Sequence, residues 1–239
     1  MLEIKLPLLN WKGKELESIY HLFQATPELG FLYKTSIRDH IRENENRGTL
    51  WAAYLNKELV GVAAIGSRRL YPHLARHGEI GVIKEFRRRR VGTALYLAQI
   101  LQMILEGRRE AEDTIIPALS PWMAGPTGCS DGGIGFLPSL NYIHYGTLPS
   151  RTSAFKDIQL WGKKTLEVHH ILSRSPEGVR VSLIDTQKTR DTFAKNLENY
   201  KKHNKPLHDA IIEQRQWVLD NFDVQAEGPH NQTKGRLLL

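Results

Sequence analysis

The segment from Val82 to Leu95 carries the residues best suited to bind a ligand. It reads V-I-K-E-F-R-R-R-R-V-G-T-A-L, so four consecutive arginines precede a run of small and apolar residues. This order predicts a strand that enters a basic turn and then a buried helix. The first amides of a helix lack internal partners and carry partial positive charge, which suits a pyrophosphate. Gly92 would let backbone and ligand approach closely.

The same segment resembles the cofactor motif of the GNAT superfamily of N-acetyltransferases, which reads approximately V-x-P-E-Y-R-G-R-G-I-G-x-A-L. The positions that match it or substitute conservatively are Val82, Glu85, Phe86, Arg87, Arg89, Val91, Gly92, Ala94 and Leu95. In the shorter form, Q/R-x-x-G-x-G/A, Arg87 takes the first position, Arg90 replaces the middle glycine and Gly92 takes the last. A register that starts at Arg89 satisfies the short form but loses the Glu-Phe-Arg match, so we prefer the first register.

The resemblance implies an N-acyltransferase whose cofactor is acetyl-CoA or another acyl-CoA. It implies that the cofactor is bound by Val82, Ile83, Arg87, Arg88, Arg89, Arg90, Val91, Gly92 and Thr93. The arginine in place of the middle glycine would hinder close approach of a phosphate to that amide, and its charge could compensate. The alternative interpretation is a solvated arginine-rich turn before an ordinary core helix.

Acyl transfer to an amine requires a base, because a lysine-like amine has a pKa of ~10.4 and must lose its proton. Family members often use a carboxylate on the motif strand, and Glu79 occupies that strand here. They usually help the thiolate to leave with a tyrosine. When F-L-P-S-L-N-Y is matched to the family's F-Y-E-K-L-G-F, Leu137 stands at the tyrosine position. The nearby substitutes are Tyr142, His144 and Tyr145.

A long loop rich in glycine and proline, Ser120–Gly133, lies between two expected strands, and such loops are often functional. We therefore add Asp131 to the catalytic candidates Glu79, Tyr142 and Tyr145. From this loop to Thr147 the chain also resembles the Mom branch of the superfamily, phage proteins that modify adenine in DNA. That likeness, best in the ending Asn-aromatic-x-x-x-Gly, implies an amine on a nucleic-acid base as the acceptor.

Other side chains with reactive or metal-binding chemistry give weaker signals. The single cysteine, Cys129, excludes an intramolecular disulfide and has no identifiable base partner. The histidines His144, His169 and His170 are too scattered for a metal signature, so we expect no metal. The N-terminus lacks a signal-peptide pattern and no apolar run reaches the ~20 residues of a membrane span, so we expect a cytoplasmic protein.

The elements that must position these residues follow an order of strand, two helices, hairpin, strand, buried helix, strand, loop and strands. The expected strands are Leu2–Leu9, Leu50–Leu55, Leu59–Ile65, Gly78–Ile83, Thr114–Leu119, Tyr142–Leu148 and Ala154–Leu160, and the expected helices are Lys14–Gln24, Thr35–Glu45 and Gly92–Leu105. This order predicts an α/β fold. It is GNAT-like, with a central mixed, mostly antiparallel sheet flanked by helices and a C-terminal helical extension.

Beyond Arg174 the pattern becomes helical. Phe193 and Tyr200 share one apolar face, Ile211 and Val218 share another, and Pro206 separates the two helices. We therefore expect an acyltransferase domain over residues 1–165, a helical extension over 166–224 and a disordered tail over 225–239.

Composition agrees with a globular protein that has an anionic partner. Of the 239 residues, 41% are apolar and 25% are charged, and the formal net charge is +7. Between Gln187 and Arg215 there are seven Lys or Arg residues against four Asp or Glu. Helices with that balance could lie along a DNA or RNA backbone, or they could pack on the domain or form a homodimer.

Three functions remain open from the sequence. The first is an acyltransferase that modifies an amine in nucleic acid, and the second is an acetyltransferase of a protein or small-molecule amine. The third is an inactive GNAT-like binding module, because Arg90 and Leu137 replace expected groups.

Overall fold

The protein is described here by a computed structural model that covers residues 1–5, 14–25, 39, 41, 50–66, 74–115, 123, 135–149 and 157–226. The predicted helix Thr35–Glu45 lies outside these ranges except for Asp39 and Ile41, which are helical. The predicted loop Ser120–Gly133 and the predicted tail lie almost entirely outside them as well.

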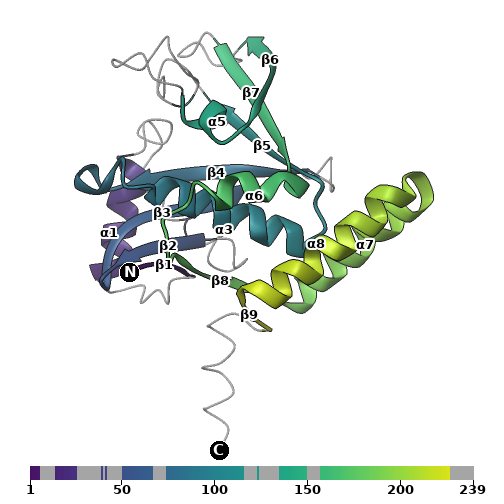
Figure 1. The fold of residues 1–239 in the computed structure, drawn as a ribbon. Coiled ribbons are helices and arrows are strands. Elements are labelled where there is room, and N and C mark those ends of the chain that lie inside the picture. The colour runs from purple at the N-terminus through teal and green to yellow at the C-terminus, as the bar shows by residue number, and fades with distance from the viewer. Residues whose placement is uncertain are drawn as a thin grey trace, which may run out of the picture.

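The described strands form one nine-stranded sheet in the order β6-β7-β5-β4-β3-β2-β1-β8-β9 (Figure 1). Their bounds are β1 Leu2–Lys5, β2 Leu50–Leu55, β3 Glu58–Gly66, β4 Leu74–Val82, β5 Glu110–Ile115, β6 Ile143–Pro149, β7 Asp157–Lys164, β8 Arg180–Ile184 and β9 Asp223–Gln225. Neighbouring strands are antiparallel except for the pairs β4–β5, β1–β8 and β8–β9. The predicted mixed, mostly antiparallel sheet is therefore confirmed.

Helices cover the two faces of this sheet. Helix α3 (Val91–Leu105) packs against β3 and β4 on one face, and helix α1 (Lys14–Gln24) packs against the same strands on the other. Side chains alternate between these faces along β2, because Leu50 and Ala52 join the α1 core whereas Trp51 and Ala53 join the α3 core. The all-round apolar sequence of α3 is explained by this central position.

The hairpin β2–β3 turns at Asn56 and Lys57, which both have positive φ, at 52° and 72°. A two-residue turn with this backbone matches the right-handed twist of the flanking strands. The structure therefore confirms the predicted hairpin, with the first strand ending at Leu55.

Two predictions about strands were wrong. The strand expected at Thr114–Leu119 is β5 and begins at Glu110, because the segment Glu110–Asp113, with its three acidic residues, pairs with β7. The region after Arg174 is not helical throughout, since β8 and β9 extend the sheet there. β8 lies parallel to β1, with Ile4 opposite Val181, a pairing that no local pattern reveals.

The remaining helices of the C-terminal region are α6 (Val168–Leu172), α7 (Gln187–His203) and α8 (Lys205–Asn221). α7 and α8 form a hairpin that projects beyond the sheet (Figure 1). Thr186 caps α7 by accepting from the Thr189 amide, and Asn204 caps α8 by accepting from the Leu207 amide. In the described part of the chain, no helix is both long and apolar enough to span a membrane.

The hairpin is joined to the C-terminal end of α3. The carbonyls of Leu105, Glu106 and Gly107 accept hydrogen bonds from Arg215 Nε at 3.2 Å, Asn196 Nδ2 at 3.0 Å and Tyr200 Oη at 3.0 Å. These carbonyls lack partners within the helix, so the hairpin caps it.

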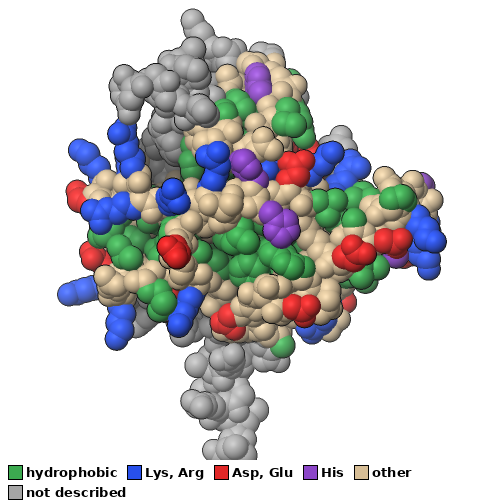
Figure 2. All heavy atoms as spheres, in the orientation of Figure 1, with side chains coloured by type: hydrophobic (Ala, Val, Ile, Leu, Met, Phe, Trp, Pro, Cys, Tyr) green, Lys and Arg blue, Asp and Glu red, His purple; other side chains and the backbone are tan. Residues whose placement is uncertain are grey.

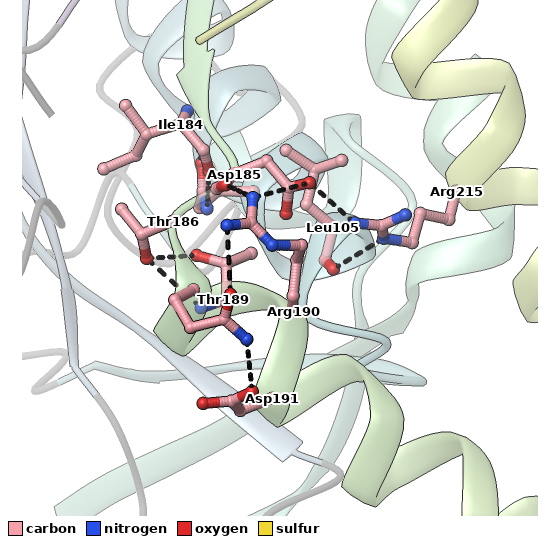
Figure 3. A network of polar contacts seen from close by, with 10 residues as sticks. Leu105, Ile184, Asp185, Thr186, Thr189, Arg190, Asp191 and Arg215 are labelled. Carbon is pink, nitrogen blue, oxygen red and sulfur yellow. Dashed lines mark hydrogen bonds and ion pairs between the residues drawn. The ribbon is translucent and has the colours of Figure 1, made fainter. Parts of the chain in front are cut away.

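Arg215 is itself held in place by its neighbours (Figure 3). Its guanidinium forms an ion pair with Asp185 at 2.8 Å, and it lies 4.6 Å from the ring centroid of Phe193. The C-terminal region therefore packs as a continuation of the core formed by the sheet and α3.

Candidate active site

The basic turn between β4 and α3 has an unusual backbone. After the short 3-10 helix η1 (Lys84–Phe86), Arg88 and Arg90 adopt left-handed conformations with φ of 61° and 63°. These are the two positions at which the pattern V-x-P-E-Y-R-G-R-G has glycine. A left-handed residue other than glycine costs roughly 1–2 kcal/mol. The arginines therefore keep the turn that glycine normally allows, at some cost in strain.

The N-terminal end of α3 is open. Its N-cap residue is Arg90, whose side chain makes no capping hydrogen bond, and the Arg90 carbonyl accepts from the Ala94 amide at 3.0 Å. The amides of Val91, Gly92 and Thr93 precede the first internal acceptor and so have no carbonyl partner inside the helix. These three amides can receive an anion.

All four arginines of the turn are exposed. Arg87 Nε donates to the Val82 carbonyl at 3.0 Å, which ties the turn to the end of β4, and the Arg89 guanidinium lies 5.5 Å from the Phe86 ring centroid. Figure 2 shows lysine and arginine side chains gathered around this end of the molecule. The open amides are therefore surrounded by positive charge.

A fork opens between β4 and β5. The two strands pair over only three residues, from Leu74–Glu110 to Arg76–Glu112, although both strands continue beyond these pairs (Figure 1). Just past the last pair, β3 and β4 fall out of step. Between the pairs Ala63–Ile80 and Ile65–His77, β3 advances by two residues and β4 by three. β4 therefore has a bulge around Gly78 and Glu79. Bulges of this kind re-aim the backbone and are frequent next to active sites.

Four aromatic or acidic side chains meet at the head of the fork, and we call them the fork cluster: His77, Tyr96, Asp113 and Tyr142. His77 and Asp113 are the first residues of β4 and β5 beyond the paired segment. The Tyr96 ring stacks on His77 with centroids 4.2 Å apart, and its hydroxyl donates to Asp113 Oδ2. The Tyr142 hydroxyl bonds His77 Nε2. All four are buried or nearly so.

Gln99, on α3, sets the direction of the hydrogen bonds. Its Nε2 donates to the Ala64 carbonyl at 2.5 Å, so its Oε1, 2.6 Å from His77 Nδ1, must accept. His77 therefore carries its proton on Nδ1, and its Nε2 accepts from the Tyr142 hydroxyl. Burial lowers the pKa of His77 to about 4, although its bond to Gln99 opposes this shift, so the ring is neutral at pH 7.

Residues 16–107 match the sequence profile of the acetyltransferase (GNAT) family. The chain contains a GNAT acetyltransferase domain. It is accordingly an N-acyltransferase, and acetyl-CoA is the cofactor that the family uses. A comparison with curated proteins found no significant match.

Solved structures share the GNAT fold at low sequence identity. A GNAT-family protein from Desulfovibrio desulfuricans aligns with a TM-score of 0.54 and 14% identity, over 69% of this chain and 99% of that one. Ard1 from Thermoplasma volcanium aligns at 0.52 and 15%, over 68% and 97%. The protein yncA from Salmonella typhimurium, solved with its cofactor acetyl-CoA, aligns at 0.51 and 10%, over 69% and 94%.

The structure does not bring all the predicted catalytic residues together. Tyr142 lies in the fork cluster, where burial, followed by the charge of Asp113, raises its pKa well above the usual value. Tyr145 is 54% exposed, donates to Glu110 and covers Gly162. Glu112 and Asp113 pair with Gly162 and Trp161, so Tyr145 lies on the sheet face opposite Asp113.

Other predicted positions have more limited descriptions. Glu79 lies at the bulge of β4, but its side chain is outside the described part, and Asp131 is outside the described residues altogether. Leu137, at the position of the family's tyrosine, is completely buried in the short helix α5 (Phe136–Ser139). Among the described residues, no group of three or more His, Cys, Asp or Glu could hold a metal ion.

Sequence reasoning missed His77, Tyr96, Gln99 and Asp113. A signal was present, because Tyr96 and Gln99 are polar residues three apart in a helix that is apolar apart from them, Thr93 and Gln102. Buried polar groups require hydrogen-bond partners, so these two residues pointed to a polar cluster against one face of α3.

Proposed function

We propose that the protein transfers the acyl group of acetyl-CoA to an amine, with the CoA pyrophosphate at the N-terminus of α3 and the thioester in the fork between β4 and β5. The observation that supports this most directly is the left-handed turn at Arg88 and Arg90 beside the uncapped amides of α3. The β4 bulge supports the position of the thioester, because the fork opens toward the end of β4 that leads into this turn.

The cofactor residues divide by role. The amides of Val91, Gly92 and Thr93 bind phosphate oxygens, and Arg87, Arg88, Arg89 and Arg90 add positive charge. Val82 and Ile83 form one side of the cofactor site. Their backbone is held in place, because the Val82 carbonyl accepts from Arg87 and the Ile83 amide donates to the Val60 carbonyl at 3.0 Å.

Gly92 offers a sharp test of this site. A Cβ there would lie 3.6 Å from the Phe136 ring and 3.8 Å from Ile80 Cδ1, which are ordinary contacts, so the protein itself has room for alanine. Gly92→Ala should stabilise the helix by up to ~1 kcal/mol and leave CoA binding largely unchanged, because the family pattern also accepts alanine at this position. Gly92→Asp should abolish binding through added negative charge.

The measurement is acetyl-CoA binding by calorimetry together with thermal unfolding. Ligand at about 100 times its dissociation constant should stabilise the wild type by ~2.7 kcal/mol. Absence of binding to the wild type would overturn the proposal and favour an inactive GNAT-like module. Equal affinity of the wild type and Gly92→Asp would show that the phosphates bind elsewhere, and Gly92→Ala serves as the control for added bulk without charge.

For the acceptor, we propose an amine on a nucleic-acid base. The support is the net charge of +7, the likeness to the Mom branch and the exposed lysines at the tip of the α7–α8 hairpin, Lys201, Lys202 and Lys205. The rest of α7 is less basic, because Lys188, Asp191, Lys195 and Glu198 alternate in sign along its outer side. The basic tip is therefore the part of the hairpin suited to a phosphate backbone.

Charge reversal tests the acceptor proposal. Lys201→Glu with Lys202→Glu should weaken binding to single-stranded DNA of any sequence and reduce its salt dependence, since each lost phosphate contact lowers the log–log slope by roughly 0.7. Lys188→Glu, at the other end of α7, is the matched control. No binding to DNA or RNA, or efficient acetylation of spermidine or a lysine peptide with nucleic acid unmodified, would establish the protein or small-molecule alternative instead.

A further inference from the structure

The fork cluster contains an ordered chain of hydrogen bonds that the cofactor motif does not explain. It runs from the Tyr142 hydroxyl to His77, from His77 to Gln99, and from Gln99 to the Ala64 carbonyl. Each donor in this chain has one acceptor, so Tyr142 points its proton at His77. The arrangement of hydroxyl, imidazole and orienting amide has the geometry of an activated hydroxyl with a base and a positioning group.

The position of Tyr142 links this chain of hydrogen bonds to the general acid that is absent at position 137. The Tyr142 amide donates to the Leu137 carbonyl at 3.0 Å, so the two residues are direct neighbours across the turn that follows α5. The backbone of Tyr142 therefore lies next to position 137, where the family pattern has its tyrosine. Tyr96 and Phe136 pack edge-on with centroids 5.1 Å apart, so α5 and α3 together hold this part of the fork.

We propose that Tyr142 and His77 form a proton relay for acyl transfer, with Gln99 as the positioning residue that holds His77 in the required tautomer. This proposal rests on the proposed acyltransferase function and deepens it. It assigns the base to the fork cluster, whereas the sequence offers Glu79 as the candidate.

The relay balances the protons of the reaction. Attack of the amine on the thioester carbonyl forms a C–N bond and leaves an extra proton on nitrogen. The Tyr142 oxygen accepts that proton while its own proton passes to His77 Nε2. When the C–S bond breaks, the thiolate takes a proton from Tyr142 and His77 returns its proton to the tyrosine. The products are the amide and free CoA thiol, and both residues end as they began.

The surroundings of His77 suit this role. The groups that face it are Tyr96 and Gln99 from α3, Tyr142 from the residue before β6, and Asp113 from β5 through Tyr96. Because the ring is neutral in the resting protein, Nε2 is available as an acceptor. Asp113, which lies close enough to raise the pKa of Tyr142, disfavours a free tyrosinate and favours transfer of both protons together.

The alternative is that the chain only satisfies buried polar groups. His77→Gln separates the two roles, because glutamine can donate and accept hydrogen bonds but cannot take up a proton at Nε2. Tyr142→Phe removes the relay hydroxyl, and Tyr200→Phe is its matched control. Tyr200 is also a buried tyrosine with one hydrogen bond, but its partner is the Gly107 carbonyl beneath the hairpin.

The experiment measures thiol release from acetyl-CoA with spermidine, a lysine peptide and an adenine-rich single-stranded oligonucleotide as amines. His77→Gln and Tyr142→Phe should each lower kcat 100-fold or more, as for loss of a general base, with the Kd for CoA unchanged. Tyr200→Phe should retain the wild-type kcat. Gln99→Leu should lower kcat about 10-fold alone and add nothing to Tyr142→Phe, because residues of one relay act as a unit.

Two outcomes would overturn the relay while leaving the acyltransferase proposal intact. One is a folded His77→Gln variant with the wild-type kcat. The other is a nitrogen NMR spectrum that shows the His77 proton on Nε2. Failure of the wild type to bind acetyl-CoA would instead contradict the proposed function, and the NMR measurement would still test the hydrogen-bond order.

Discussion

The two ends of helix α3 differ in almost every respect. At the N-terminal end, the first amides are uncapped, the preceding turn has two left-handed arginines, and the side chains of the turn are exposed. At the C-terminal end, three carbonyls are capped by side chains of the α7–α8 hairpin. The fifteen residues between them span about 22 Å.

This difference shows how one helix can serve both stability and binding. An open, strained end can persist only if the rest of the structure holds it in place. Burial of α3 and its capped C-terminus supply that support, and Arg215 adds a cation at the end where the helix dipole favours one. The N-terminal amides can therefore remain available for a phosphate.

The largest effect on stability is expected at His77, which packs against the middle of α3, between its two ends. Its pKa is lowered to about 4 from 6.5, so the unfolded chain binds the proton more readily and stability falls as the pH drops from about 6.5 toward 4. The loss should be on the order of 3 kcal/mol. Urea unfolding of the wild type and His77→Gln at pH 7.0, 5.5 and 4.5 should show a smaller acid loss in the variant. Parallel curves would show that His77 is not buried as a neutral ring.

The second effect concerns the capped end. Arg215→Met should lower the free energy of unfolding by about 2 kcal/mol, because it removes a charge-assisted hydrogen bond to Leu105 and the ion pair with Asp185. The Kd for acetyl-CoA should stay within about twofold. The exposed Arg180→Met is the control. A large loss of CoA affinity without loss of stability would contradict the separation of the two ends.

The smallest effect is expected at the basic tip of the hairpin. Lys202 pairs with Glu198 at 3.0 Å, but both side chains are largely exposed. Exposed pairs at this spacing contribute about 0.3–0.5 kcal/mol, so Glu198→Gln should change the unfolding midpoint only slightly. Any effect on DNA binding should be an increase, since a carboxylate is removed. Weaker DNA binding would argue against contact of the tip with phosphates.

Local patterns predicted the fold well where neighbouring residues determine it. The helix Lys14–Gln24 and the strand Leu50–Leu55 have the predicted bounds, because an apolar stripe marks the helix and a polar turn follows the strand. β8 escaped prediction, because it is five residues long and its partner is β1, far away in the sequence. Strand pairing of that kind depends on tertiary structure.

The candidate site likewise has one part that local sequence predicts and one part that depends on tertiary structure. The turn from Arg87 to Gly92 is contiguous, so a motif could identify it, and the strain at Arg90 follows from a missing glycine. The fork cluster draws His77, Asp113 and Tyr142 from separate elements, and they meet only through the β4–β5 pairing and the fold of α5. No spacing in the sequence encodes that meeting.

The most direct test of the central claim is the Kd for acetyl-CoA of the double variant Arg88→Gly with Arg90→Gly. Glycine relieves the left-handed strain. The free energy of unfolding should therefore rise by at most about 1–2 kcal/mol for each replaced residue. CoA affinity should nevertheless fall 10-fold or more at low salt, and less at 0.5 M salt, because two cations beside the phosphates are lost. A more stable variant that binds CoA as tightly as the wild type would contradict the account.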